Sequence, residues 1–335
     1  PPELVVVSLL EDRALAWPAG CAVTAASPCA PELVLLGSLA GHSVRHEGPL
    51  GIFIEAVPDH RMTLEMMRAA AVANGNEIPP RRAHVVANYA EKTETALGVA
   101  ERVLKTLPMV KTYIVAEPSS QTLNAAKMQA WIHSSVIVAS RLEGWAKSLG
   151  LTKAVDVSGM TPERVLAEWA PSWPVKGLGI EQAPGPFMVD YGVGTGALSW
   201  YNSDTRDFNN SLRNGFLEHL DEDSVLLGWG CNWTDEVGCV SVTSSHGVLV
   251  EASQDDVSLL TYGGYHHHSH FPFAQKARPG RPLPPAPKAV HTVTFVLSDG
   301  DNVHWLHDGW LSEIWTSKLR GKFPLSVGFN AAERD

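Results

Sequence analysis

The fold of this chain is decided by the stretch VTFVLSDGDNVHW, which occupies Val293–Trp305. Its first half, up to Leu297, is an apolar run of strand length, which predicts a buried strand. The strand runs directly into Ser298-Asp299-Gly300-Asp301-Asn302, and His304 and Trp305 follow closely. In α/β sheets and barrels, catalytic groups lie at the carboxyl ends of strands. The stretch therefore predicts an α/β protein with a candidate site directly after this strand.

Two carboxylates in this stretch, Asp299 and Asp301, are separated by a single glycine. They would share one face of a regular strand, and Gly300 also permits a turn that brings both into one cleft. Glycoside hydrolysis needs two carboxyl groups, one as acid and one as base or nucleophile. The same residues also fit an Asx-type turn in which Asn302 starts a helix. The pattern by itself leaves a catalytic pair and a structural turn equally open.

Five prolines lie just upstream, within residues 279–287. Proline fixes the backbone and removes a hydrogen-bond donor, so residues 276–288 are interpreted as a linker or long loop. We expect residues 289–335 to begin a (β/α)-barrel-like catalytic domain. A closed barrel needs about eight strand–helix units and roughly 200 or more residues, so we expect a truncated start of this domain.

The part of the chain before the linker alternates strand-length apolar runs with helical patterns, which implies a mostly parallel sheet covered on both sides. In an N-terminal α/β region at 1–175, strands are expected at Leu4–Leu10, Leu33–Gly37, Gly51–Val57 and Val110–Ala116, and helices at Met62–Asn74, Tyr89–Leu107, Ser119 to about His133 and from Thr161. In a middle α/β region at 176–275, strands are expected at Phe187–Tyr191, Ser224–Gly228, Gly238–Thr243 and Gly247–Glu251, with a helix inside Ser203–Leu220.

Composition excludes several classes of protein. The chain carries 26 Lys and Arg against 36 Asp and Glu, a formal charge of −10, which argues against nucleic acid as a partner. No apolar stretch is long enough to span a bilayer. The four cysteines form two pairs, each eight residues apart, and neither pair has the CxxC spacing of a zinc site: Cys21 with Cys29, and Cys231 with Cys239. They fit free buried thiols, which we favour slightly, or two local disulfides in a secreted protein.

A second acidic segment, Gly228–Glu236, also follows a predicted strand. It contains Trp229 and Trp233, whose ring faces suit sugar binding, and it ends on Glu236. A solvated loop fits the segment equally well. Because pockets tend to form between domains, we expect this segment to lie close to Asp299 or Asp301.

Other motifs are weaker. Residues 192–197, GVGTGA, have the spacing of a dinucleotide-binding loop but lack the helix that should follow, so a flexible turn is favoured. The run HHHSH at His266–His270 is interpreted as a polar loop rather than a metal site. The chain contains no GxSxG, GxxxxGK[ST] or HExxH motif, which disfavours serine hydrolases, P-loop enzymes and zincins.

Residues 294–305, TFVLSDGDNVHW, closely resemble the start of the C-terminal domain of the GxGYxYP family of putative glycoside hydrolases. Upstream segments agree with the family in the same order, so the resemblance covers roughly residues 110–330; they include Ser119–Ala126, Val189–Tyr191, Val225–Trp229 and Val240–Gly247. The motif after which the family is named does not occur in these 335 residues.

The resemblance implies an enzyme that cleaves O-glycosidic bonds in a poly- or oligosaccharide, without a cofactor. The residues carried over from the resemblance are Asp299, Asp301 and Glu236 as catalytic carboxylates and Asn302 as a sugar-binding side chain. Trp229, Trp233, Trp305 and His304 are expected to bind substrate because of their residue types and their polar neighbours. Two alternatives stay open: a metal-dependent polysaccharide deacetylase using His304 or His307, and a carbohydrate-binding protein without catalysis. A secreted or periplasmic location is expected. The sequence gives no information on the oligomeric state.

Overall fold

The computed structural model describes residues 3–8, 25–46, 50–55, 83–85, 95–203, 211–230, 236–251, 296–297, 316–319, 321–322 and 326–327. Within these residues the chain is an α/β protein whose paired strands all run parallel. The predicted fold class, α/β with parallel sheets, is therefore confirmed. No helix in the described part of the chain is long and apolar enough to cross a membrane.

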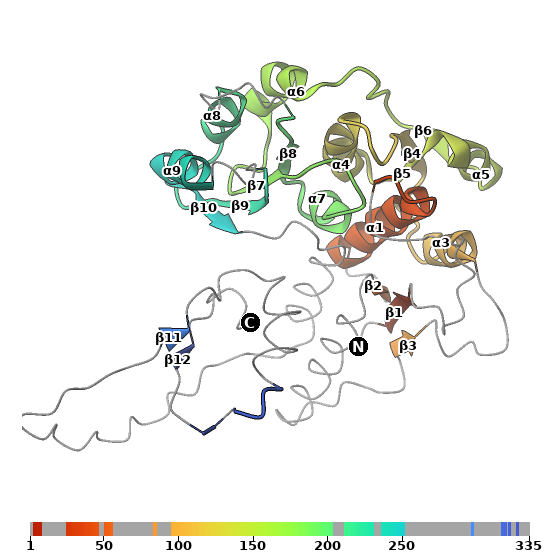
Figure 1. Cartoon of the computed structure of the whole chain (residues 1–335). Coiled ribbons are helices and arrows are strands. Elements are labelled where there is room, and N and C mark those ends of the chain that lie inside the picture. Colours follow the sequence, from red (N-terminus) through yellow and green to blue (C-terminus); the bar gives the residue numbers. More distant parts are fainter. Residues whose placement is uncertain are drawn as a thin grey trace, which may run out of the picture.

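Four parallel sheets are described, and Figure 1 shows their arrangement. The first has the order β2-β1-β3, with β1 at Glu3–Ser8, β2 at Leu50–Glu55 and β3 at Ala83–Val85. The second has the order β5-β4-β6, with β4 at Thr112–Val115, β5 at Ser135–Val138 and β6 at Thr152–Lys153. The third has the order β10-β9-β7-β8, with β7 at Leu178–Glu181, β8 at Leu198–Trp200, β9 at Val225–Gly228 and β10 at Leu249–Glu251. The fourth pairs β11, Val296–Leu297, with β12, Ser326–Val327.

Helices connect and cover these strands. They are α1 at Ala30–Arg45, α3 at Ala96–Leu104, α4 at Thr122–His133, α5 at Glu143–Ser148, α6 at Pro162–Glu168, α7 at Val189–Thr195, α8 at Ser211–Leu217 and α9 at Glu236–Ser245, with short 3-10 turns η2 at Ser140–Leu142 and η3 at Ala170–Ser172. The predicted start of α6 is confirmed, because Thr161 caps it by accepting a bond from the backbone N–H of Arg164 at 3.4 Å.

Three predicted strands are helical in the structure. Leu33–Gly37 lies inside α1, Phe187–Tyr191 overlaps the start of α7, and Gly238–Thr243 lies inside α9. In α1 the error has a clear cause, since every residue from Leu33 to Ser43 is buried and the helix has no polar stripe. A short apolar run in a helix buried on all sides has the same appearance as a buried strand. The predicted strands at β1, β2, β4, β9 and β10 are confirmed within two or three residues at each end.

One buried core joins the two regions that the sequence separates at residue 175. It contains Ile114 and Leu123 from the first region and Val193, Trp200 and Leu226 from the second, among other residues. The boundaries at 175, 275 and 288 stay a prediction. Helix α1 lies between the first two sheets, because it contacts β2 in one and β5 in the other (Figure 1).

Helices α1 and α7 approach closely through glycines. A Cβ added at Gly41 would lie 2.5 Å from the Asp190 carbonyl oxygen and 2.9 Å from the Gly194 nitrogen, so the two backbones are in contact. Gly192 and Gly194 belong to the GVGTGA motif, and the structure places this motif in α7 and its C-cap, Gly196. The prediction of a flexible turn there is wrong, because Gly192 and Gly194 lie within the helix, and a Cβ added at Gly192 would lie 3.0 Å from the Lys127 side chain of α4.

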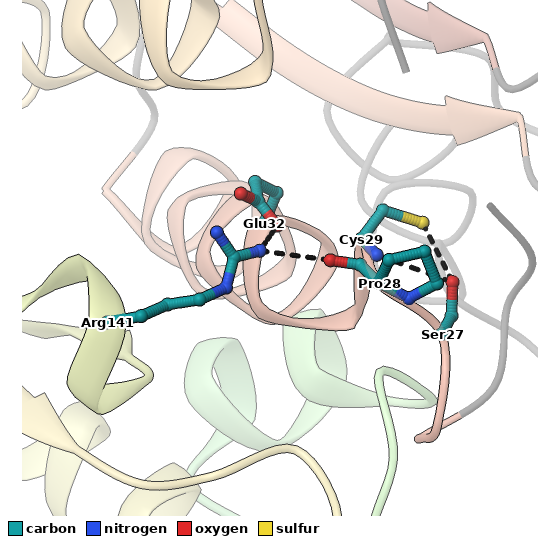
Figure 2. Close-up of polar contacts among 5 residues, drawn as sticks. All are labelled: Ser27, Pro28, Cys29, Glu32 and Arg141. Carbon is teal, nitrogen blue, oxygen red and sulfur yellow. Dashed lines mark hydrogen bonds and ion pairs between the residues drawn. The ribbon is translucent and has the colours of Figure 1, made fainter. Parts of the chain in front are cut away.

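Cys29 and Cys239 are both disulfide-bonded, so the slight preference for free thiols is wrong. Cys29 precedes α1, where the Ser27 Oγ lies 3.1 Å from the Cys29 Sγ. Figure 2 shows that Arg141, from η2, reaches the same corner. Its guanidinium donates to the Pro28 carbonyl oxygen at 3.0 Å and pairs with the Glu32 carboxylate. The N-terminus of α1 is therefore fixed by a disulfide and by an arginine of a distant element.

His42 is buried in the last turn of α1 and stays neutral near pH 7. Its Nε2 donates to the Ser135 carbonyl oxygen at 2.9 Å, whereas its Nδ1 has no hydrogen-bond partner among the described residues. Burial lowers the pKa of His42 from 6.5 to about 4. A proton added at Nδ1 would place an unpaired charge inside the core.

The pH dependence of stability tests this burial. Unfolded His42 takes up a proton below pH 6.5 and folded His42 only near pH 4, so its contribution to stability is present above pH 6.5 and is lost as the pH falls towards 4. The loss should be about 3 kcal/mol, since one pKa unit corresponds to roughly 1.4 kcal/mol. We expect His42→Gln, which keeps a donor for Ser135, to lack this loss in urea unfolding at pH 4 to 7, while the exposed control His133→Gln retains it. Parallel curves for His42→Gln and wild type would contradict the assignment.

A matched pair of glycine substitutions tests the contact between α1 and α7. We expect Gly41→Ala to destabilise the protein by about 1–3 kcal/mol or more, because backbone atoms cannot move aside as a flexible side chain can. Gly144→Ala in α5 meets nothing within 4 Å and should be neutral or stabilise by roughly 0.5–1 kcal/mol through its helix propensity. Thermal melts measure both, and equal melting temperatures for the two variants would refute the close packing.

Candidate functional site

Most of the predicted site residues lie outside the described residues: Asp299, Asp301, Asn302, His304, Trp305 and Trp233. The strand that precedes them is described at β11, which ends at Leu297, one residue before Ser298. It pairs in parallel with β12, as expected for the start of a (β/α) unit. The predicted proximity of Gly228–Glu236 to Asp299 or Asp301 stays a prediction, and His266–His270 also lies outside the described part.

Two predicted residues are described, and both follow β9. Trp229 comes directly after the strand and is half-buried, while Glu236 is the first residue of α9. In the third sheet the chain passes from β7 to β8 on one side and then to β9 on the other. Ligands of open parallel sheets bind where the strand order reverses in this way, outside the carboxyl ends of the strands. We call this place the carboxyl edge, made of Glu181, Gln182 and Gly228–Gly230.

A buried ion pair lies at the carboxyl edge. Glu181, the last residue of β7, is 1% exposed, and Arg213 of α8 is 3% exposed. The Arg213 guanidinium donates to both carboxylate oxygens, from Nε at 2.7 Å and from Nη2 at 3.0 Å. Burial raises the pKa of the Glu181 carboxyl, and the charge of Arg213 opposes that rise. A two-bond arginine–carboxylate pair is rigid as well as strong, so it fixes the side chain of Glu181.

Two glycines rest on Glu181. Gly228 ends β9 at φ +92, and a Cβ added there would lie 2.5 Å from the Glu181 carbonyl oxygen. A Cβ added at Gly230 would overlap the Glu181 carboxyl group. Only glycine fits at either position, so Trp229 lies between two glycines that pack against Glu181, one against its carbonyl oxygen and one against its side chain. The turn that carries Trp229 is therefore held against β7 and its ion pair.

Two buried amide side chains complete the carboxyl edge. The backbone of Gln182 is fixed on both sides, because its N–H donates to the Trp200 carbonyl oxygen at 3.0 Å and its carbonyl accepts from Asn124 Nδ2 at 3.0 Å. Gln182 is 4% exposed and Asn124 is 2% exposed. Within the described part of the chain, Gln182 Oε1 and Asn124 Oδ1 have no hydrogen-bond partner. A Cβ on Gly228 would lie 3.1 Å from Gln182 Oε1, so this oxygen faces the end of β9.

A second buried ionisable group is Lys127 of α4, which packs against Gly192 of α7. Its Nζ has no hydrogen-bond partner among the described residues, and burial lowers its pKa to about 7 while the charge of Asp190 raises it. Among the described residues no group of three or more His, Cys, Asp or Glu could hold a metal ion.

Sequence reasoning missed four residues: Glu181 and Gln182 of the carboxyl edge, and Arg213 and Asn124, which form hydrogen bonds with them. Glu181 ends β7 and Gln182 follows it, so the rule that polar residues at strand ends carry function could have identified both. Arg213 and Asn124 give no such signal, since each lies in a helix with no pattern that points to the strand. Trp200 ends β8 beside a polar segment of the sequence, yet its side chain is fully buried and stacks on Phe216, with ring centroids 4.5 Å apart.

No curated protein matches the chain. A solved structure described as a putative hydrolase from Bacteroides thetaiotaomicron VPI-5482 matches with a TM-score of 0.72 and 22% identity, over 98% of this chain and 57% of that chain. At this identity the likeness shows the fold alone, and this chain spans little more than half the length of that protein. Residues 289–331 match the family model of the GxGYxYP putative glycoside hydrolase C-terminal domain, which confirms the resemblance predicted from the SDGDN core.

Proposed function

We propose that the protein acts as a glycoside hydrolase that cleaves O-glycosidic bonds in a poly- or oligosaccharide. The proposal is carried by the family match at residues 289–331, because the matched segment contains Asp299, Asp301 and Asn302 directly after β11. The similar solved structure is itself described as a putative hydrolase. Because this chain covers only 57% of that structure, the activity of a whole enzyme is part of the proposal.

The proposed chemistry uses the two aspartates in different protonation states. Like charges held close together cannot both ionise easily, so the pKa of one carboxyl rises towards the range of a general acid. That group protonates the leaving oxygen, while the other stabilises the developing positive charge or attacks the sugar. Asn302 would bind sugar hydroxyls beside them. Glu236, at the start of α9, is the proposed further carboxylate, and Trp229, Trp233, Trp305 and His304 are the proposed sugar-binding side chains.

Replacing one aspartate in the full-length protein tests the catalytic assignment. We expect Asp301→Asn to reduce kcat by roughly 100-fold or more, the range lost with a general acid or base. The melting temperature should change little, since asparagine forms the same kind of turn. Hydrolysis of a confirmed substrate and a thermal melt provide the two readouts, and the exposed control Asp221→Asn should match wild type in both. Normal turnover in Asp301→Asn would move the assignment to Asp299 and Glu236.

Resistance to chelators separates this proposal from the deacetylase alternative. Carboxylate acid–base hydrolysis needs no divalent ion, so activity should be unchanged after dialysis against EDTA. A deacetylase that polarises its substrate with a metal would lose activity and regain it when the metal is added back. Release of acetate without new reducing ends would identify the alternative.

We further propose that the protein is secreted or periplasmic. The disulfides at Cys29 and Cys239 support this location, because disulfides persist in oxidising compartments and are rare in the cytosol. We expect protein purified from an oxidising compartment to show no reactive thiols under denaturing conditions, with Cys21 joined to Cys29 and Cys231 to Cys239 in non-reducing peptide mapping. Reduction should lower the melting temperature, since each bridge contributes roughly 2–4 kcal/mol. Four reactive thiols in such protein would contradict the proposal.

A further inference from the structure

The carboxyl edge holds groups that the proposed catalytic aspartates do not explain. The Glu181–Arg213 ion pair is buried at the reversal of strand order, and breaking such a pair is strongly unfavourable. The Glu181 carboxylate packs against the turn Gly228–Gly230, and a Cβ at Gly230 would overlap this carboxylate. One short turn is therefore held in place by a buried ion pair and by two positions that only glycine can occupy. The turn carries Trp229, which is half-buried, with its indole Nε1 on the buried side.

The second observation is the unpaired amide beside the same turn. Gln182 Oε1 is buried and no described residue bonds to it, although the backbone of Gln182 is held at both its N–H and its carbonyl. A buried acceptor without a donor is unfavourable in the folded protein, and the protein avoids it at most positions. Asn124 Oδ1, which belongs to the side chain that holds the Gln182 carbonyl, is unpaired as well. Two such acceptors at one edge indicate that hydroxyl or amide donors come from a ligand.

We propose that the carboxyl edge is a saccharide subsite in which the Trp229 ring packs against a sugar ring and Gln182 accepts a hydrogen bond from a sugar hydroxyl. A saccharide fits both features, since its ring carbons pack on aromatic faces and its hydroxyls are donors. Asn124 fixes the backbone of Gln182, and Glu181 and Arg213 act as positioning residues for the Trp229 turn. The choice of a saccharide rests on the proposed function.

Gln182→Met distinguishes a ligand-binding amide from a structural one. Methionine has a similar length without the polar atoms, so removing an acceptor that is unpaired in the free protein should leave the melting temperature equal or higher. Binding to the 335-residue chain is measured by calorimetry with soluble cello-, xylo-, malto- and manno-oligosaccharides. For each sugar that wild type binds, Kd should rise at least about ten-fold, the effect of one lost hydrogen bond to the ligand. The control Gln129→Met, another buried glutamine, should leave Kd unchanged.

A glycine pair tests the support of the turn. Gly230→Ala must displace the turn from Glu181 and should weaken the same sugar by about ten-fold or more. Gly177→Ala, whose added Cβ meets nothing within 4 Å, should bind like wild type. Each of the three proteins, wild type, Gly230→Ala and Gly177→Ala, is also made with Trp229→Phe, and subtracting the two emission spectra isolates the fluorescence of Trp229. This Trp229 spectrum should differ from that of wild type in Gly230→Ala and should be unchanged in Gly177→Ala.

Three results would overturn the subsite: a clearly lower melting temperature for Gln182→Met, unchanged sugar affinity in Gln182→Met, or no binding of any of these sugars by the wild-type chain. The proposed function has a separate readout. If Gln182→Met binds normally while Asp301→Asn abolishes hydrolysis, the subsite is wrong and the hydrolase assignment stands. If the chain binds sugar through Gln182 but the full-length protein cleaves no glycoside, the subsite stands and the hydrolase assignment falls.

Discussion

The contact between α1 and α7 is the constraint on which the described structure depends. At Gly41 the backbone of one helix touches the backbone of the other, a distance that any side chain would prevent. Helix α1 also contacts β2 and β5, and α7 contacts α4, so this one contact links the first and second sheets to the elements around the third. Because the two helices meet at their backbones, a small displacement cannot be absorbed by changing side-chain rotamers. The position of the third sheet relative to α1 is therefore closely determined.

Parallel strand pairing has a direct consequence for chemistry in the third sheet. The carboxyl ends of β7 and β9 meet at one edge, so Glu181, Gln182 and Gly228 become neighbours although they are distant in sequence. Burying the Glu181 carboxylate is unfavourable unless a counter-charge reaches it, and Arg213 supplies that charge from α8. An apolar pair of similar volume would often be as stable or more stable, so stability alone does not explain the ion pair. The ion pair has a further role in positioning the turn that carries Trp229.

Two buried polar atoms that lack partners among the described residues, His42 Nδ1 and Gln182 Oε1, lie in different parts of the fold. His42 Nδ1 lies in the core of α1 and only makes the fold sensitive to acid. Gln182 Oε1 lies at a strand end where ligands of such sheets bind. Burying either atom without a hydrogen bond destabilises the folded protein. We attribute a ligand-binding role only to the atom at the strand end. Natural proteins accept such costs at functional positions more than elsewhere.

The sequence by itself determined the class of the fold and the family of one segment. Alternating apolar runs predicted parallel α/β structure, and the SDGDN core after a strand predicted the family match at 289–331. Local patterns suffice for these conclusions, because strand length and a rare motif are properties of adjacent residues. The same patterns assigned Leu33–Gly37 to a strand, since a helix buried on every side shows no polar stripe.

Only the tertiary structure decided the carboxyl edge and the role of the GVGTGA glycines. Arg213 lies 32 residues from Glu181, and nothing in α8 marks it as the partner of a strand end. The glycines of α7 and its C-cap were attributed to a turn, and a Cβ added at Gly192 or Gly196 would instead meet Lys127 or Trp131 of α4, about 65 residues earlier in the chain. Contacts of this kind are set by how sheets and helices pack in space, and packing between distant segments leaves no periodic trace in either segment alone.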